Sequence, residues 1–259
     1  MPDLAQLVRG LQWFSLGAIL ALITRLGWER LHRIYPCFFA YLVFEAARSL
    51  AVLPLPTSRT LYGTIYMVTE PIIWVLYFMI VRELYGLVLK DRPGLATAGR
   101  YTLTGAIIAA TAIAVATLGP DLNNQGGPYP VLHLVNVLSR AITTTLVFFL
   151  LSITVFLAWF PIPLNRNTIV YCLGYSGFFI AKTLSLLARN VVGPGVAQWA
   201  SATNLLVANL CLAVWIWKLN AAGERSELVI GHSWRKEDAD RILQQLDAIN
   251  DALARSTRR

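Results

Sequence analysis

The chain has 259 residues, of which 56% are hydrophobic and only 14% are charged, and its mean hydropathy is +0.57. Soluble globular proteins are about 45–50% apolar and about 25% charged, so these values exclude an ordinary soluble domain, a disordered chain and a disulfide-rich secreted module. The apolar residues come in runs of about 20, which is the length of a membrane-spanning helix.

Seven apolar segments are predicted to form membrane-spanning helices, at about residues 6–24, 34–54, 61–81, 102–119, 131–160, 168–188 and 197–217. Helix-breaking residues separate several of them. Pro54 and Pro56 end the second segment, because proline lacks the amide hydrogen that a helix needs, and Pro161 and Pro163 end the fifth. The sequence therefore predicts an all-α, polytopic membrane protein, with a seven-helix transmembrane domain at residues 1–219.

The basic residues are divided unevenly between the two sides of this predicted bundle. The loops of one side and the C-terminal tail hold sixteen Lys and Arg residues, whereas the loops of the other side hold two, Arg59 and Arg189. Since cytoplasmic loops carry the excess of Lys and Arg, we expect the N-terminus outside and the tail in the cytoplasm. The membrane is expected to be a bacterial-type inner membrane. The net charge of +8 is explained in the same way, and no nucleic-acid partner is expected.

Residues 220–259 are predicted to form a cytoplasmic tail, in which a linker precedes an amphipathic helix at about residues 235–254. Its apolar stripe steps by four, three and four residues and consists of Ile242, Leu246, Ile249 and Leu253. Such a stripe is expected to be buried. Docking on the protein's own bundle or on the membrane surface is favoured, and a cytoplasmic protein partner or self-association through residues 236–254 remains an alternative.

Apart from Arg9, near the start of the first segment, five charged residues lie within the predicted spans: Glu45, Arg48, Glu70, Arg140 and Lys182. A charge at the centre of a membrane helix costs about 2.5–3.5 kcal/mol on insertion scales, so these side chains are expected to face the bundle interior, together with Asn204. Pro71 directly follows Glu70 and is expected to kink the third helix. The sequence therefore predicts one polar, net-basic ligand site in the outer half of the bundle.

This site is the basis for the expected function. Three basic groups against two acidic ones indicate a small anionic or proton-linked ligand. Glu70 is favoured as the group that changes protonation, because burial raises the pKa of a carboxyl while a nearby cation lowers it. We expect a receptor-like or sensor protein whose tail passes a signal to a partner. Two alternatives remain open: a transporter of small molecules or ions, and a structural or assembly subunit whose charges form ion pairs only.

No catalytic residue, cofactor or metal site is expected. The run Gly174-Tyr175-Ser176-Gly177 is similar to the GxSG motif of rhomboid proteases, but the seventh segment lacks the histidine base which that chemistry requires. The layout also resembles that of microbial rhodopsins, whose retinal is bound by a lysine in the middle of the seventh helix, whereas Lys218 lies at the inner end of that segment here. His32, His133 and His232 are far apart in sequence.

Overall fold

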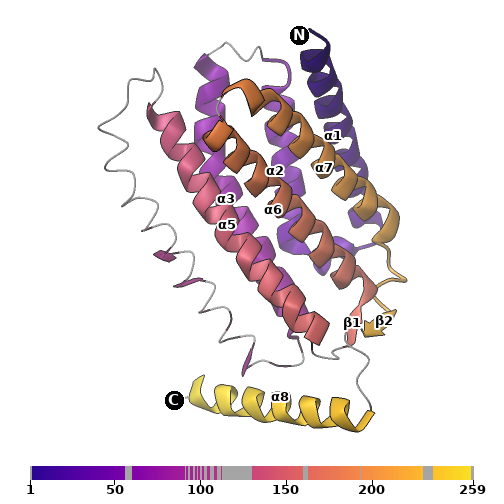
Figure 1. Cartoon of the computed structure of the whole chain (residues 1–259). Helices are drawn as coiled ribbons and strands as arrows, with labels where there is room; N and C mark the ends of the chain where they lie inside the picture. The colour runs from indigo at the N-terminus through magenta and orange to yellow at the C-terminus, as the bar shows by residue number, and fades with distance from the viewer. Residues whose placement is uncertain are drawn as a thin grey trace.

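The structure is a computed structural model that describes residues 2–55, 60–90, 130–159, 163–192, 194–229 and 236–257, with the separate positions 92, 94, 95, 97, 99, 101, 104, 105, 108, 109 and 112. The helices in this part of the chain are α1 (Pro2–Trp28), η1 (Leu31–Arg33), α2 (Pro36–Val52), α3 (Thr60–Val88), α5 (Pro130–Trp159), α6 (Arg166–Val192), α7 (Pro194–Lys218) and α8 (Lys236–Thr257) (Figure 1). The prediction of an all-α protein is confirmed. The predicted span at 102–119 lies largely outside the described residues.

Four of the described helices are long and apolar enough to cross a membrane, by their length and composition: Gln6–Trp28, Gly63–Val88, Arg166–Leu186 and Gln198–Lys218. Their outward faces carry large apolar side chains, such as Phe14 on α1 and Val68 on α3, which are 60% and 64% exposed. Charged and polar groups are found inside instead, which is the arrangement expected in a bilayer.

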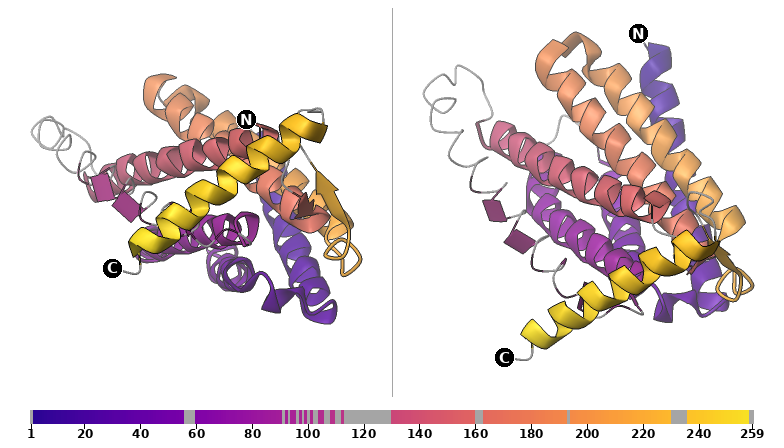
Figure 2. Two further views of the ribbon diagram at one scale, coloured as in Figure 1. Left: turned by 90° about the horizontal axis from the view of Figure 1, so that it is seen from below. Right: turned by 60° about the horizontal axis from the view of Figure 1, so that its bottom comes forward.

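Within the described residues, six long helices pack side by side in a closed ring of neighbours. α1 packs on α2, α2 on α3, α3 on α5, α5 on α6, α6 on α7, and α7 returns to α1. The ring encloses one interior, which is filled by fully buried residues from different helices, among them Leu22, Leu42, Leu84, Leu146 and Phe179. α8 lies across the end of this bundle, opposite the end at which α1 begins (Figures 1 and 2).

The start of α2 is held by a carboxylate from another helix. Proline stands at the first position of α2, and the residue before it, Tyr35, makes no side-chain cap. Glu83 of α3 accepts a hydrogen bond from the Cys37 amide at 2.7 Å and another from the Phe38 amide at 3.4 Å. An anion at a helix N-terminus satisfies unpaired amides and interacts favourably with the helix dipole, so Glu83 fixes α2 against α3.

A two-stranded antiparallel sheet joins the segment before α6 to the segment after α7. β1 (Pro163–Asn165) pairs with β2 (Glu227–Val229), with Leu164 opposite Leu228. The sequence predicted only a linker at β2, so the sheet is a feature that sequence reasoning missed. It holds the chain between α7 and α8 against the end of the bundle.

Glu224 is the centre of a polar cluster beside this sheet. Its carboxylate accepts hydrogen bonds from the Tyr35 hydroxyl, from Asn165 Nδ2 at 3.1 Å and from Asn167 Nδ2 at 2.7 Å. The cluster joins the chain before α2, the start of α6 and the segment after α7.

α8 docks on the chain that follows α3. The side-chain oxygen Asn250 Oδ1 accepts hydrogen bonds from the amides of Gly94, at 2.9 Å, and Leu95, at 3.3 Å. Arg92 Nε also pairs with Asp247 Oδ1 at 3.1 Å. The tail helix therefore contacts its own bundle, at the segment into which α3 leads.

The buried face of α8 differs in one position from the predicted stripe. Leu246 is buried and Ile242 and Leu253 are half-buried, but Ile249 is 52% exposed. Asn250 is buried in its place, because the docking surface is a pair of backbone amides that needs an acceptor. The prediction for Ile249 was therefore wrong.

The closeness of Gly94 to α8 gives a test of this docking. A Cβ atom at Gly94 would lie 2.2 Å from the Asn250 carbonyl oxygen and 2.8 Å from the Ala254 amide nitrogen, so Gly94→Ala is expected to push α8 away. Hydrogen exchange of the α8 amides should rise about tenfold or more, equivalent to about 1.4 kcal/mol of overpacking. Gly105→Ala is the matched control, since a Cβ there meets nothing within 4 Å. Equal exchange in both variants would contradict the docking.

Candidate functional site

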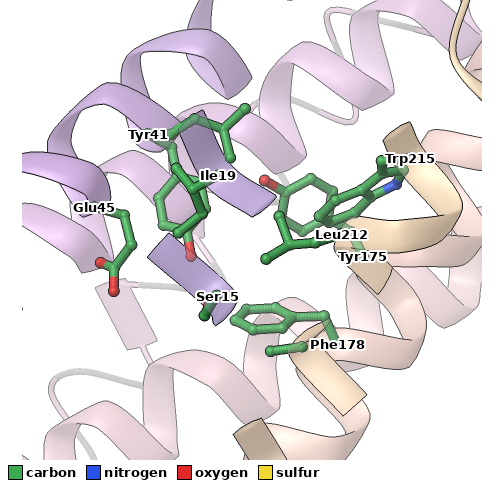
Figure 3. Close-up of a pocket in the computed structure, with 10 residues that line it drawn as sticks. Ser15, Ile19, Tyr41, Glu45, Tyr175, Phe178, Leu212 and Trp215 are labelled. Atoms are coloured by element: carbon green, nitrogen blue, oxygen red, sulfur yellow. The ribbon is translucent and has the colours of Figure 1, made fainter. Parts of the chain in front are cut away.

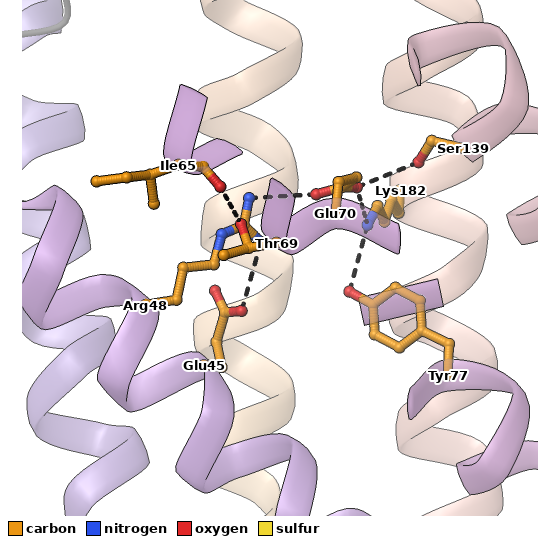
Figure 4. A network of polar contacts seen from close by, with 8 residues as sticks. All are labelled: Glu45, Arg48, Ile65, Thr69, Glu70, Tyr77, Ser139 and Lys182. Carbon is orange, nitrogen blue, oxygen red and sulfur yellow. Dashed lines mark hydrogen bonds and ion pairs between the residues drawn. The ribbon is translucent and has the colours of Figure 1, made fainter. Parts of the chain in front are cut away.

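Glu70 of α3 lies at the centre of a network of buried charges, with its side chain only 2% exposed. Arg48 Nη2 of α2 donates to Glu70 Oε2 at 3.2 Å, and Lys182 Nζ of α6 lies 3.6 Å from Glu70 Oε1. Ser139 Oγ of α5 donates to the same Oε1 at 3.3 Å. Three other helices of the ring therefore contact one carboxylate (Figure 4).

The network continues on both sides of Glu70. Arg48 Nη1 lies 3.6 Å from Glu45 Oε2, one helical turn earlier on α2. Lys182 Nζ donates to the Tyr77 hydroxyl at 3.3 Å and lies 4.6 Å from the centre of that ring. The described part of the network thus holds two carboxylates and two cations, which balance in charge.

Helical spacing explains why these side chains meet. Glu45 and Arg48 are three residues apart, so they lie on one face of α2. Glu70 and Tyr77 are seven residues apart, which is about two turns, and they share the inner face of α3. Pro71 lies inside α3, directly after Glu70. Breaking a buried ion pair costs about 3–5 kcal/mol, which makes this network a strong constraint on how the helices pack.

The structure brings together four of the six residues that the sequence singled out, Glu45, Arg48, Glu70 and Lys182. The side chain of Arg140 lies outside the described part of the structure. No described contact connects Asn204 to the network, although its Oδ1 is buried and lacks a hydrogen-bond partner among the described residues.

Sequence reasoning missed two members of the network, Ser139 and Tyr77. A serine or a tyrosine inside an apolar segment is common and carries no charge to mark it. The available signal was position: Ser139 precedes Arg140 on α5, and Tyr77 is two turns from Glu70 on α3.

A small cavity of about 60 Å³ lies beside the network, between α1, α2, α6 and α7. Its wall includes Ser15, Tyr41, Glu45, Tyr175, Phe178 and Trp215. Figure 3 shows these side chains around a common space, with the Tyr175 hydroxyl directed toward the side of Tyr41. Since one water needs roughly 10–15 Å³ by this measure, the cavity has room for a few waters or for a very small ligand.

Two polar groups of the cavity wall differ in their surroundings. Tyr175 is fully buried, and its hydroxyl has no hydrogen-bond partner among the described residues. Trp215 Nε1 also lacks one, but this atom is packed against Gly174, where a Cβ would lie only 2.4 Å away. An unpaired buried polar group costs about 1–3 kcal/mol, so the Tyr175 hydroxyl calls for a partner inside the cavity.

Glu45 connects the cavity to the ion-pair network. Its carboxylate borders the cavity and contacts Arg48 at 3.6 Å, and its side chain is 26% exposed, against 2% for Glu70. Arg48 is held on its other side by Glu70. A change of charge at Glu45 therefore acts on the whole network through Arg48.

Within the described residues, no three or more His, Cys, Asp or Glu side chains gather in a way that could hold a metal ion. Comparison of the chain with models of protein families, with curated proteins and with solved structures finds no match.

Proposed function

We propose that the chain is a multi-pass protein of a bacterial-type inner membrane, with seven spans, an external N-terminus and a cytoplasmic tail. The four long apolar helices, their apolar outward faces and the sixteen-to-two division of basic residues support this topology. α3 ends and α5 begins at opposite ends of the bundle (Figure 1), as a crossing at residues 102–119 requires.

Within this topology, the protein acts as a receptor-like sensor. The observation that carries this function is the course of α3: the helix holds Glu70 in the network and leads directly to Gly94 and Leu95, which bind α8. A displacement of α3 relative to α2 is therefore expected to reach the tail helix through the short segment after Val88.

The input to this sensor is a change of charge at Glu45. Neutralising its carboxylate, by a proton or by a bound cation, removes the Glu45–Arg48 ion pair and keeps the Arg48–Glu70 pair. The balance of two carboxylates and two cations is then lost in a buried environment, where uncompensated charge is costly. The uncompensated charge favours a repacking of α2 against α3, and α8 responds at the far end of α3.

The geometry favours Glu45 over Glu70 as the responsive group. The Glu70 carboxylate is already contacted by Arg48, Lys182 and Ser139, whereas Glu45 borders the cavity. The expectation of an anionic ligand depended on a third cation, Arg140. The cavity borders a carboxylate instead, which favours a proton-linked or cationic input.

The test is hydrogen exchange of α8 in the full chain in lipid nanodiscs, between about pH 5 and about pH 8. We expect the ratio of the wild-type exchange rate to the Glu45→Gln exchange rate to change with pH, because Glu45 titrates whereas the variant keeps the neutral state throughout. Glu227→Gln, an exposed carboxylate on β2, is the control and should behave as the wild type. Identical α8 exchange in all three proteins at every pH would contradict the sensor.

A structural or assembly subunit is the second function, and the saturated contacts of Glu70 favour it. In that case Glu45→Gln changes neither α8 nor any partner, and the network contributes only to stability. Solute accumulation by reconstituted vesicles would instead identify the transporter that the sequence left open.

A further inference from the structure

We infer that the cavity between α1, α2, α6 and α7 binds a small ammonium cation, of the size of ammonium or methylammonium, with Glu45 as its counter-ion. The inference rests on the proposed function in one respect, since it names the ligand of the same sensor. Three independent properties of the cavity wall carry it: charge, aromatic composition and an unpaired hydroxyl.

The charge of the wall has one sign. Glu45 is the only charged residue among those that line the cavity, and its one described ion-pair partner, Arg48, is shared with Glu70. A cation in the cavity is attracted by the Glu45 carboxylate, whereas an anion is repelled by it. The site therefore selects positive charge.

The rest of the wall is rich in aromatic rings, contributed by Tyr41, Tyr175, Phe178 and Trp215. Aromatic faces carry negative charge density and attract cations, by about 0.5–1 kcal/mol at exposed sites and about 2 kcal/mol or more where water is removed. Rings combined with a single carboxylate are the chemistry by which proteins hold organic ammonium groups.

The Tyr175 hydroxyl supplies a directional contact. It is fully buried, is directed into the region of the cavity, and lacks a hydrogen-bond partner among the described residues (Figure 3). An ammonium N–H donates to this oxygen and satisfies it. A metal cation such as Na⁺ has no N–H to donate and must exchange a tightly held hydration shell for few oxygen ligands.

The volume limits the cation to a very small one. A protein cavity of about 150 Å³ holds benzene, which has six non-hydrogen atoms, so a cavity of about 60 Å³ holds about two or three. Ammonium and methylammonium fit this limit. Tetramethylammonium, with five non-hydrogen atoms, exceeds it.

The experiment measures the thermal unfolding temperature of the detergent-solubilised full chain in the chloride salts of sodium, ammonium, methylammonium and tetramethylammonium at equal ionic strength. Binding to the folded state alone raises this temperature in a saturable way. We expect ammonium or methylammonium to raise it by about 3 °C or more over sodium, and tetramethylammonium to leave it unchanged. No difference among the four salts, or the largest rise with tetramethylammonium, would overturn the inference.

Two pairs of variants locate the effect. Glu45→Gln removes the counter-ion and should abolish the rise, whereas Glu227→Gln should keep it. Tyr175→Phe removes only the hydroxyl and should reduce the rise, whereas Tyr101→Phe, at a residue that is 72% exposed, should not. A rise that persists in both Glu45→Gln and Tyr175→Phe places the cation elsewhere and refutes the site.

Failure of this inference is distinguishable from failure of the sensor. Salt-dependent unfolding reports binding even when α8 does not respond, and pH-dependent exchange of α8 reports a response even when no ammonium binds.

Discussion

Replacing Glu70 with leucine is expected to lower the free energy of unfolding by about 3–5 kcal/mol. The substitution leaves Arg48 and Lys182, whose side chains are 13% and 15% exposed, with Glu45 as the only carboxylate of the described network. It also removes the acceptor for the Ser139 hydroxyl. The measurement is reversible unfolding in mixed micelles, followed by loss of helical structure.

Two further variants show whether charge is the cause. Glu45→Gln should cost only about 1 kcal/mol, because Arg48 keeps Glu70. The combined variant Glu45→Gln, Arg48→Met, Glu70→Leu and Lys182→Met removes all four charges of the described network together. It should recover most of the loss, since apolar replacement of a whole buried ion pair is often neutral or stabilising. A combined variant as unstable as Glu70→Leu would show that shape, rather than charge, sets the cost.

The second large effect is expected at Glu224, where Glu224→Ala should lower the free energy of unfolding by about 2–4 kcal/mol. Tyr35 and Asn167 are fully buried and both donate to this carboxylate. Each buried donor left unsatisfied costs about 1–3 kcal/mol, although Asn167 Nδ2 keeps the Asn220 carbonyl as a second acceptor. The control Glu227→Ala, at an exposed residue of the same segment, should stay within about 0.5 kcal/mol of the wild type.

A double-mutant cycle between Tyr35→Phe and Glu224→Gln tests the contact itself. The coupling energy should be about 1 kcal/mol or more, since residues in one hydrogen-bond network are not additive. Additive losses would mean that the cluster fills space at the end of the bundle without coupling its groups.

The all-α class followed from the long apolar runs, because only helices and closed barrels can span a membrane. Most helix positions followed from proline and polar breaks. α3 runs to Val88 and has 29 residues, in line with the expectation that the third segment extends to roughly 30 residues. The convergence of Glu45, Arg48, Glu70 and Lys182 was also expected, because a bundle offers charges one interior.

The missed features are those made by residues far apart in sequence. Glu83 caps α2 at Cys37, which lies 46 positions earlier, and neither residue carries a local pattern that indicates the other. Asn250 is buried because two backbone amides face it, which no side-chain pattern records. The cavity depends on how the side chains of four helices pack against one another. A sequence pattern does not predict packing of this kind.

The pairing of β1 with β2 also affects the binding of α8 to other proteins, because it limits how far α8 can move from the bundle. Val229 is fixed at the end of the bundle and Lys236 begins α8, so seven residue steps separate them, a reach of at most roughly 25 Å. A linker of this length keeps an undocked α8 near its own binding segment at an effective concentration of about millimolar. A cytoplasmic protein that binds the face around Leu246 therefore competes with the intramolecular docking of α8. It binds only when its affinity is high or when the contacts of Asn250 with the Gly94 and Leu95 amides are already weakened.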